Sequence, residues 1–208
     1  MRDKNNGVNI GFFVDDTVEI AEDVKIYPNV YILGNSKIGK GTVIYPSTTI
    51  ENSIIGENCV IKSSYIEESE VKNNVTIGPF AHLRPNSVVL DDCKIGNFVE
   101  IKNAVIGKGT SASHLAYVGD ADIGEKCNIG CGAIFVNYNG KSKSRTIVED
   151  NCFIGSNCNV VAPVHIKKGS YVCAGTTITI DTNEDDFVIG RSRETVKSNR
   201  AHLYWGKK

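Results

Sequence analysis

Aliphatic residues recur at every sixth position along most of the chain. The first run is unbroken over six repeats and contains Ile20, Ile26, Ile32, Ile38, Ile44 and Ile50. After single-residue slips, the same spacing returns in the segments 55–61, 71–101, 123–129 and 154–178. A period of six excludes an amphipathic α-helix, whose apolar residues repeat about every 3.6 positions.

Glycine follows many of these aliphatic residues, and a small residue tends to stand four places further on. The motifs are IGKG, IGEN, IGPF, IGNF, IGEK, IGCG and IGSN. Simple period-two alternation does not produce a glycine once per six residues, whereas a backbone bend after each short strand does. We therefore predict an all-β fold, a parallel β-helix with three hexads per triangular coil and the aliphatic residues stacked inside.

The repeat fails in two places. The polar segment after Phe135, VNYNGKSKSRT, is too long for a turn, and we expect it to leave the coil as an extruded loop over about 136–146. Beyond Ile189 the basic tail contains no hexads. We expect a β-helix domain over 18–190 and an irregular tail over 191–208, with function concentrated where segments project from the rigid scaffold.

Composition narrows the possible partners and the compartment. The net charge is −1, from 23 basic and 24 acidic residues, so no overall field would attract nucleic acid or an anionic membrane. No apolar stretch has the length of a signal peptide or a membrane span, so we expect a cytoplasmic protein. Seven cysteines, an odd number, then favour reduced thiols over a disulfide framework.

The cysteines also raise the possibility of a metal site, which the repeat makes unnecessary. Five of them occupy the slot that takes a small buried side chain: Cys59, Cys93, Cys127, Cys152 and Cys158. Cys131 and Cys173 lie outside that slot and remain candidates for lining a cleft. We predict no metal. Among the histidines, His114 stands out, because the hexad before it has Ala112 in the aliphatic position.

Residues 77–191 resemble the C-terminal acetyltransferase half of the bacterial bifunctional uridyltransferase and glucosamine-1-phosphate N-acetyltransferase family. The resemblance rests on IGPFAHLRPNSV, IGNFVEIKNAVIGKGTSASHLAYVGDADIG, NIGCGAIFVNYNGKSKSRTIV, FIGSNCNVVAPV and CAGTTI. Residues 1–17 resemble the linker that precedes this half, and no uridyl-transfer motif is present. The resemblance implies a left-handed coil and a homotrimer with sites at subunit boundaries.

The same resemblance implies transfer of the acetyl group of acetyl-CoA to the amine of glucosamine 1-phosphate, on the route to UDP-N-acetylglucosamine and cell-wall precursors. The amine would attack directly, without an acetyl-enzyme. By similarity His114 is the general base, since a neutral imidazole can accept the ammonium proton. Glu100 would orient the imidazole, and Ser156 would steady the histidinium beside the thioester.

The acceptor needs cations for its phosphate. By similarity Arg84, Lys102 and, in the extruded loop, Lys143 take that role. Tyr117 and Asn128 match residues that hydrogen-bond the sugar and its phosphate. The matches for acetyl-CoA are Asn137 and Tyr138 beside the pantetheine and thioester, Ala174 where the arm passes a corner, Ser156, Arg191 at the CoA phosphates, and Cys131. The backbone N–H of Cys131 is a candidate oxyanion donor between two glycines.

Two departures from the family leave alternatives open. Where relatives carry an aromatic residue in the tail, this sequence has Arg200, followed by Tyr204 and Trp205. NYNG, with Asn139, also replaces the more usual NYDG. One alternative is a hexapeptide acetyltransferase for another amino sugar or small acceptor. The other is a non-catalytic trimeric scaffold.

Overall fold

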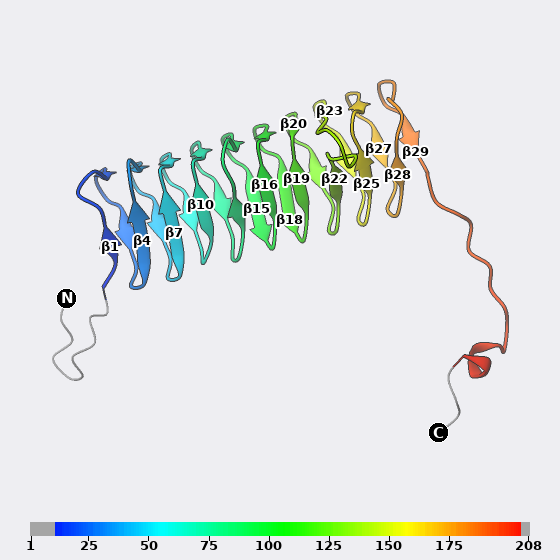
Figure 1. Cartoon of the computed structure of the whole chain (residues 1–208), viewed down its shortest axis with the longest axis horizontal. Helices are drawn as coiled ribbons and strands as arrows, with labels where there is room; N and C mark the ends of the chain where they lie inside the picture. The colour runs from blue at the N-terminus through cyan, green and yellow to red at the C-terminus, as the bar shows by residue number, and fades with distance from the viewer. Residues whose placement is uncertain (1–10, 205–208) are drawn as a thin grey trace.

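Short parallel strands follow one another along the chain and stack into a prism with three faces. The computed structural model describes residues 11–204. Each strand from β1 to β25 pairs in parallel with the strand three places further on, and β27 pairs with β29. The resulting coils lie side by side along one long axis (Figure 1). The predicted parallel β-helix is therefore confirmed.

The strands form three sheets, here called A, B and C. Sheet A has ten strands: β1 (Phe13–Val14), β4 (Val30–Leu33), β7 (Thr48–Glu51), β10 (Tyr65–Glu67), β13 (His82–Leu83), β16 (Glu100–Lys102), β19 (Tyr117–Gly119), β22 (Ile134–Val136), β25 (Asn159–Val161) and β28 (Thr177–Ile178). Sheet B has nine: β2 (Glu19–Ile20), β5 (Lys37–Ile38), β8 (Ile54–Ile55), β11 (Glu70–Val71), β14 (Val88–Val89), β17 (Val105–Ile106), β20 (Ala121–Ile123), β23 (Thr146–Val148) and β26 (His165–Ile166).

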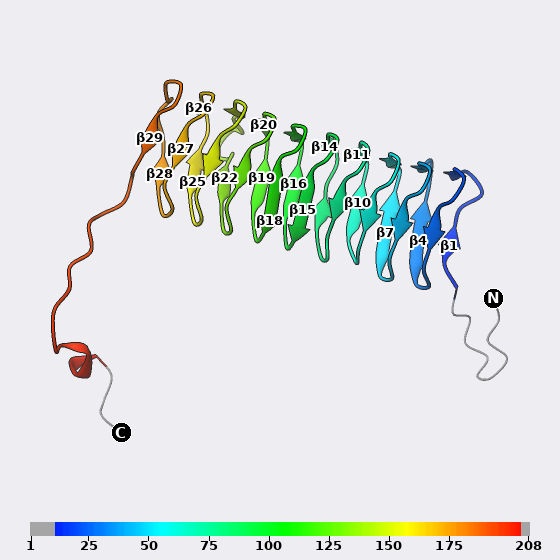
Figure 2. The ribbon, with the colours of Figure 1, turned by 180° about the vertical axis from the view of Figure 1, so that it is seen from behind.

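Sheet C closes the prism and also has ten strands. They are β3 (Lys25–Ile26), β6 (Val43–Ile44), β9 (Val60–Ile61), β12 (Thr76–Ile77), β15 (Lys94–Asn97), β18 (Ser111–His114), β21 (Asn128–Ile129), β24 (Phe153–Ile154), β27 (Tyr171–Val172) and β29 (Phe187–Val188). The chain runs from sheet A to B to C and back to A, and Figure 2 shows the stack from the opposite side.

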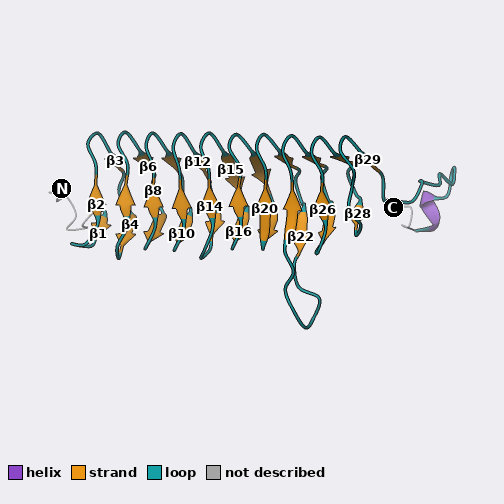
Figure 3. Ribbon diagram, turned by 90° about the horizontal axis from the view of Figure 1, so that it is seen from above, coloured by secondary structure: helices purple, strands orange, loops and turns teal. Residues whose placement is uncertain are grey.

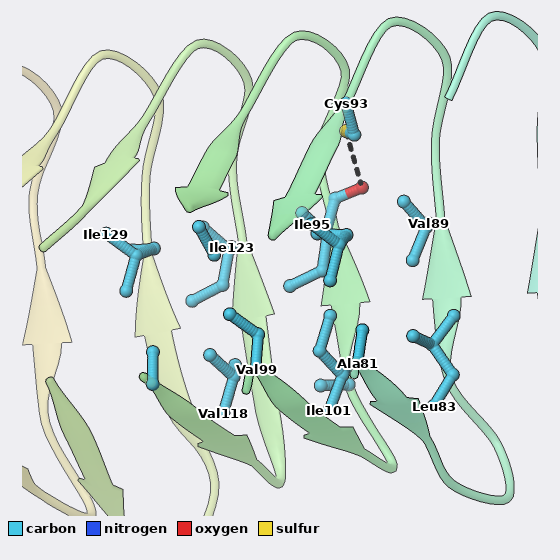
Figure 4. Packing of buried hydrophobic residues seen from close by; sticks show 14 of the residues in the cluster. Ala81, Leu83, Val89, Cys93, Ile95, Val99, Ile101, Val118, Ile123 and Ile129 are labelled. Atoms are coloured by element: carbon cyan, nitrogen blue, oxygen red, sulfur yellow. Dashed lines mark hydrogen bonds between the residues drawn. The ribbon is translucent and has the colours of Figure 1, made fainter. Parts of the chain in front are cut away.

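The hexad residues fill the interior of the coil, as the sequence predicts. Ile95, Ile101 and Ile129 point inward and are at most 2% exposed (Figure 4). Full burial of such a side chain contributes about 1.5–3 kcal/mol, so the stack of hexad residues is the main stabilising element of the fold. Ile20 belongs to the same series but is 41% exposed, because it lies at the N-terminal end of the stack.

The glycine after the hexad residue allows neighbouring coils to approach closely. A Cβ at Gly130 would overlap the backbone of Gly155 and Ser156 in the next coil. The corners have a second requirement, because many of their residues adopt a positive φ that asparagine and aspartate tolerate better than most side chains. Asn86, Asn103 and Asp120 meet this requirement at one corner of three successive coils.

The cysteines behave as small buried residues, which confirms the interpretation from the repeat. Cys59, Cys93, Cys127, Cys152 and Cys158 are all buried, and so is Cys173, whereas Cys131 is partly exposed. Figure 4 shows Cys93 above the aliphatic stack. Burial raises the pKa of the Cys93 thiol to about 11, so this thiol stays protonated at neutral pH.

The loop between β22 and β23 is the one interruption within the stack of described coils, and Figure 3 shows it projecting away from the prism. Tyr138 and Lys143 form an antiparallel bridge inside it, and Asn139 Oδ1 accepts the N–H groups of Lys141 and Ser142 at its tip. After β29 the chain leaves the coil and ends its described part near η1, a 3-10 helix over Ala201–Leu203 (Figure 1). Trp205 and residues 1–10 of the linker-like segment lie outside the described residues.

Candidate functional site

Several predicted residues line one edge of the prism, where sheet C turns into sheet A. Backbone hydrogen bonds join successive coils along this edge. Leu115 N–H donates to the Asn97 carbonyl at 2.9 Å, and Gly132 N–H donates to the Leu115 carbonyl at 2.9 Å. The members of this edge, here called the corner column, are Asn97, His114, Cys131, Ser156 and Ala174, with the Arg191 side chain at the end.

The same ladder continues through the second half of the corner column. Asn157 N–H donates to the Cys131 carbonyl at 2.8 Å, and Gly175 N–H donates to the Ser156 carbonyl at 2.8 Å. The Arg191 guanidinium then donates to the Ala174 carbonyl at 2.7 Å. Residues that are up to 94 positions apart in the sequence, from Asn97 to Arg191, therefore lie in order along one edge.

His114 is exposed at the end of β18 and makes its hydrogen bond to a residue that the sequence did not single out. Its Nδ1 lies 2.7 Å from Asn97 Oδ1 in the preceding coil. The two residues are direct partners in the β15–β18 register. Asn97 lies in the IGNF motif, and its place one coil before His114 is the signal that could have identified it.

Glu100 has a different partner from the one predicted. Its carboxylate accepts a hydrogen bond from Arg84 Nη1 at 2.8 Å, and this ion pair raises the pKa of Arg84. Within the described chain, no hydrogen bond joins Glu100 to His114. The structure therefore links Glu100 to the proposed phosphate-binding arginine, and Asn97 to the imidazole.

A cleft of about 590 Å³ opens beside the extruded loop and gathers the predicted phosphate ligands. Arg84 and Lys102 reach it from the ends of β13 and β16, and Lys143 reaches it from the loop. The Lys143 ammonium is close enough to lower the pKa of Lys102, and desolvation adds to this effect. Mutual repulsion of cations makes the cleft a favourable place for an anion.

Asp120 lies in the wall of this cleft and was missed by sequence reasoning. It is 7% exposed and accepts hydrogen bonds from the side chains of Asn103 and Asn137. Burial raises the pKa of this carboxyl, but the two amide donors and the cations Lys102 and Lys143 together hold it below its ordinary value. An acidic residue at a corner that carries asparagine in the two preceding coils is the sequence signal for it.

The extruded loop is attached to the coil at both of its ends. At the first end, Asn137 reaches Asp120 and also lies 3.5 Å from the Tyr117 hydroxyl. At the second end, Arg145 pairs with the Asp122 carboxylate and donates to the carbonyl oxygens of Asn103 and Ala121. Sequence reasoning missed Arg145 as well, because its partners lie 23 to 42 residues earlier.

One predicted ligand lies apart from these groups. Asn128 is exposed on sheet C, in register with Ser111 and Phe153, whereas the cleft opens beside sheet A. Tyr138 is 55% exposed on the extruded loop, where it forms a bridge with the cleft residue Lys143. Tyr117, by contrast, folds back over its own strand, where a Cβ on Gly119 would overlap the tyrosine hydroxyl.

The glycines beside Cys131 have a role within the fold itself. Gly130 packs against the next coil, and Gly132 has a φ of +74° with its missing Cβ facing Asn157. Access for a ligand is therefore not needed to explain them. Among residues 11–204, no group of three or more potential metal ligands lies together, and no helix is long and apolar enough to cross a membrane.

The three-sided coil and the hexad core define a parallel β-helix of the hexapeptide-repeat class. Three family models match it: "GlmU-like, C-terminal hexapeptide" over residues 42–125, "Hexapeptide repeat of succinyl-transferase" over 145–179, and "Bacterial transferase hexapeptide (six repeats)" over 17–52. The chain is similar to the GlmU-like hexapeptide family over residues 42–125, in agreement with the sequence resemblance.

Curated relatives support this assignment over most of the chain. Bifunctional protein GlmU of Caldicellulosiruptor saccharolyticus is 54% identical over 89% of this chain, and that of Thermodesulfovibrio yellowstonii is 48% identical over 94%. The chain spans about two fifths of their length, 40% and 42% respectively. Arabidopsis UDP-N-acetylglucosamine acyltransferase shares the fold, with a TM-score of 0.61 at 21% identity over 85% of this chain and 69% of that one.

Proposed function

We propose that this chain transfers the acetyl group of acetyl-CoA to the amine of glucosamine 1-phosphate, giving N-acetylglucosamine 1-phosphate and free CoA. The observation that carries the proposal is the presence of two features at the two edges of sheet A. The corner column presents an exposed histidine at one edge of sheet A, and the cleft, which includes the cations Arg84, Lys102 and Lys143, lies at the other edge of the same sheet. The similarity to GlmU proteins, which covers about nine tenths of this chain, supports the same activity.

His114 acts as the general base in this proposal. The amine of the acceptor loses a proton to the imidazole and attacks the thioester carbonyl carbon, forming the new C–N bond. The tetrahedral intermediate then breaks its C–S bond, and the departing thiolate recovers the proton from the histidinium. Ser156, two coils along the corner column, steadies that charge, and the Cys131 N–H donates to the oxyanion.

The cleft binds the phosphate of the acceptor. Arg84 supplies paired donors in a fixed geometry, held by its ion pair with Glu100, while Lys102 and Lys143 act as point charges. Glu100 therefore acts through Arg84 in this proposal. Tyr117 and Asn128 donate to the sugar and its phosphate.

The donor lies along the second half of the corner column. The pantetheine arm passes Ala174, which is exposed and too small to block it, and Arg191 meets the CoA phosphates. Asn137 and Tyr138 contact the thioester end from the loop. Because acetyl-CoA is a metabolite of the cytoplasm, we place the reaction there.

The active form in this proposal is a homotrimer with sites at the subunit boundaries. An apolar ridge beside the corner column supports it. Phe80 and Phe98 stack at 5.4 Å, and together with Leu115 in the next coil they are 54–59% exposed. Such a ridge favours contact with a second copy of the chain. The separation of Asn128 from the cleft is also explained if neighbouring copies complete each other's site.

The test measures thiol release from acetyl-CoA with glucosamine 1-phosphate and with glucosamine as acceptors. We expect release to need the phosphate and to fall by roughly 100-fold or more in His114→Ala, because general-base catalysis contributes about 10²–10⁴-fold. His82→Ala is the matched control, since His82 pairs with Glu67 outside the cleft. We expect it to keep the activity of the unaltered protein.

Other results would favour the two alternatives. Equal rates with both acceptors would contradict the phosphate-binding cleft and favour another small acceptor. Absence of release from a folded assembly would overturn the proposal in favour of a scaffold. Sedimentation at micromolar concentration would test the trimer, and we expect Phe98→Glu to shift it toward monomer.

A further inference from the structure

Asn97 is the hydrogen-bond partner of His114, and the proposed chemistry assigns it no role. Its side-chain oxygen lies 2.7 Å from Nδ1 of the imidazole. Two features of the backbone fix the positions of these residues. Asn97 and His114 are direct partners in the β15–β18 ladder, and the Asn97 carbonyl accepts the N–H of Leu115 at 2.9 Å.

The chemistry of the amide oxygen determines which imidazole nitrogen carries the proton. A carboxamide oxygen can only accept, so a neutral imidazole must donate to it from Nδ1. The lone pair then lies on Nε2, at the other side of the ring. Nε2 is therefore the atom available to take a proton from an attacking amine, and Nδ1 is not.

A neutral hydrogen-bond partner also affects the charged form of the imidazole differently from a charged partner. A carboxylate at this position would stabilise the histidinium, whereas an amide fixes the tautomer without adding a charge. Glu100, the carboxylate that the sequence placed beside the base, is instead occupied by Arg84 at 2.8 Å. Asn97 is thus the group whose contact with the imidazole the structure describes.

We propose that Asn97 is a positioning residue that holds His114 in the Nδ1–H tautomer and so presents Nε2 as the base. This inference rests on the proposed function for its effect on rate, but its statement about the tautomer does not. Asn97 acts through His114, so its loss should lower kcat and leave KM for both substrates nearly unchanged.

The experiment compares Asn97→Leu, which removes the acceptor at similar volume, with Asn97→Asp, which keeps an acceptor oxygen. We expect Asn97→Leu to lower kcat about tenfold, the effect of losing one hydrogen bond to the base. We expect Asn97→Asp to stay within about threefold of the unaltered protein. Asn159→Leu is the matched control, because Asn159 also bonds a side chain of the next coil, Thr177, and lies outside the corner column.

Nitrogen NMR of the labelled His114 imidazole provides the second readout. We expect a protonated Nδ1 and an unprotonated Nε2 in the unaltered protein, and a mixture of tautomers in Asn97→Leu. A proton on Nε2 in the unaltered protein would overturn the inference, as would full kcat in Asn97→Leu. If the unaltered protein transfers no acetyl group but shows the Nδ1–H form, the proposed function fails while the tautomer assignment holds.

Discussion

Two neighbouring stretches of sheet A carry opposite charge at equivalent outward positions. In the earlier coils, Glu51 and Glu67 are direct partners in the β7–β10 register. In the next two coils the same position, directly after the inward residue, holds Arg84 and Lys102. Only the second stretch lines the cleft beside the extruded loop.

The interior does not change between the two stretches. Ile66, Leu83 and Ile101, the inward residues next to these charges, are all 0% exposed. The repeat fixes the inward residue, the small buried residue and the corner, and it leaves the outward residue directly after the inward one free to vary. A β-helix can therefore change from an acidic surface to an anion-binding cleft within one coil, without any cost to its core.

The largest expected effect comes from extending the acidic stretch by one coil. In Lys102→Glu we expect kcat/KM for glucosamine 1-phosphate to fall roughly 100-fold, because a charge-assisted contact is lost and a repulsion is added. The assay is CoA thiol release. Glu67→Gln changes the charge at the same outward position of sheet A but outside the cleft, and we expect it to change kcat/KM little. Equal losses in the two variants would contradict the assignment of the phosphate site.

A smaller effect should follow from loosening the loop, which accompanies only the basic stretch. In Arg145→Ala we expect kcat/KM to fall about tenfold, because the loop that carries Lys143 and Asn137 loses its attachment to Asp122 and to two carbonyls. Lys108→Ala removes an ion pair with Asp92 that is about half exposed, and serves as the control. Unchanged kinetics in both variants would show that the loop is positioned by other contacts.

The smallest expected effect is a pH dependence of stability at the same attachment. Arg145 lowers the pKa of Asp122, so the pair stabilises the fold above the ordinary carboxyl pKa of about 4 and loses this contribution as pH falls through the lowered value. Both side chains are partly exposed, so the effect is small. Between pH 6 and pH 3, we expect the melting temperature of Asp122→Asn to fall by roughly 2 °C less than that of the unaltered protein. Parallel curves would contradict this account.

Much of the fold could be predicted from the sequence, because every hexad obeys the same local rule. The period of six identifies the inward residues, and the small residue four places on identifies five buried cysteines. The break after Phe135 locates the loop. The resemblance to a known family also named His114, Ser156 and Arg191, which the structure places along one edge.

The partners of those residues could not be predicted in the same way. Glu100 was expected beside the imidazole, and it pairs with Arg84. Asn97, Asp120 and Arg145 lie within the quoted motifs, but only their neighbours in other coils distinguish them from the other polar residues there. The two glycines that flank the candidate oxyanion donor Cys131 are already required by the packing of the coils.

The period, the buried stack and the set of candidate residues therefore follow from the amino-acid sequence alone, because burial in a repeating coil depends on position within six residues. Which side chains meet depends on how the coils stack in space. A contact such as His114 with Asn97 spans seventeen residues, and that of Arg145 with Asp122 spans twenty-three. Such contacts depend on how many residues each corner and loop takes between coils, and one residue more or less would bring a different side chain to the same edge.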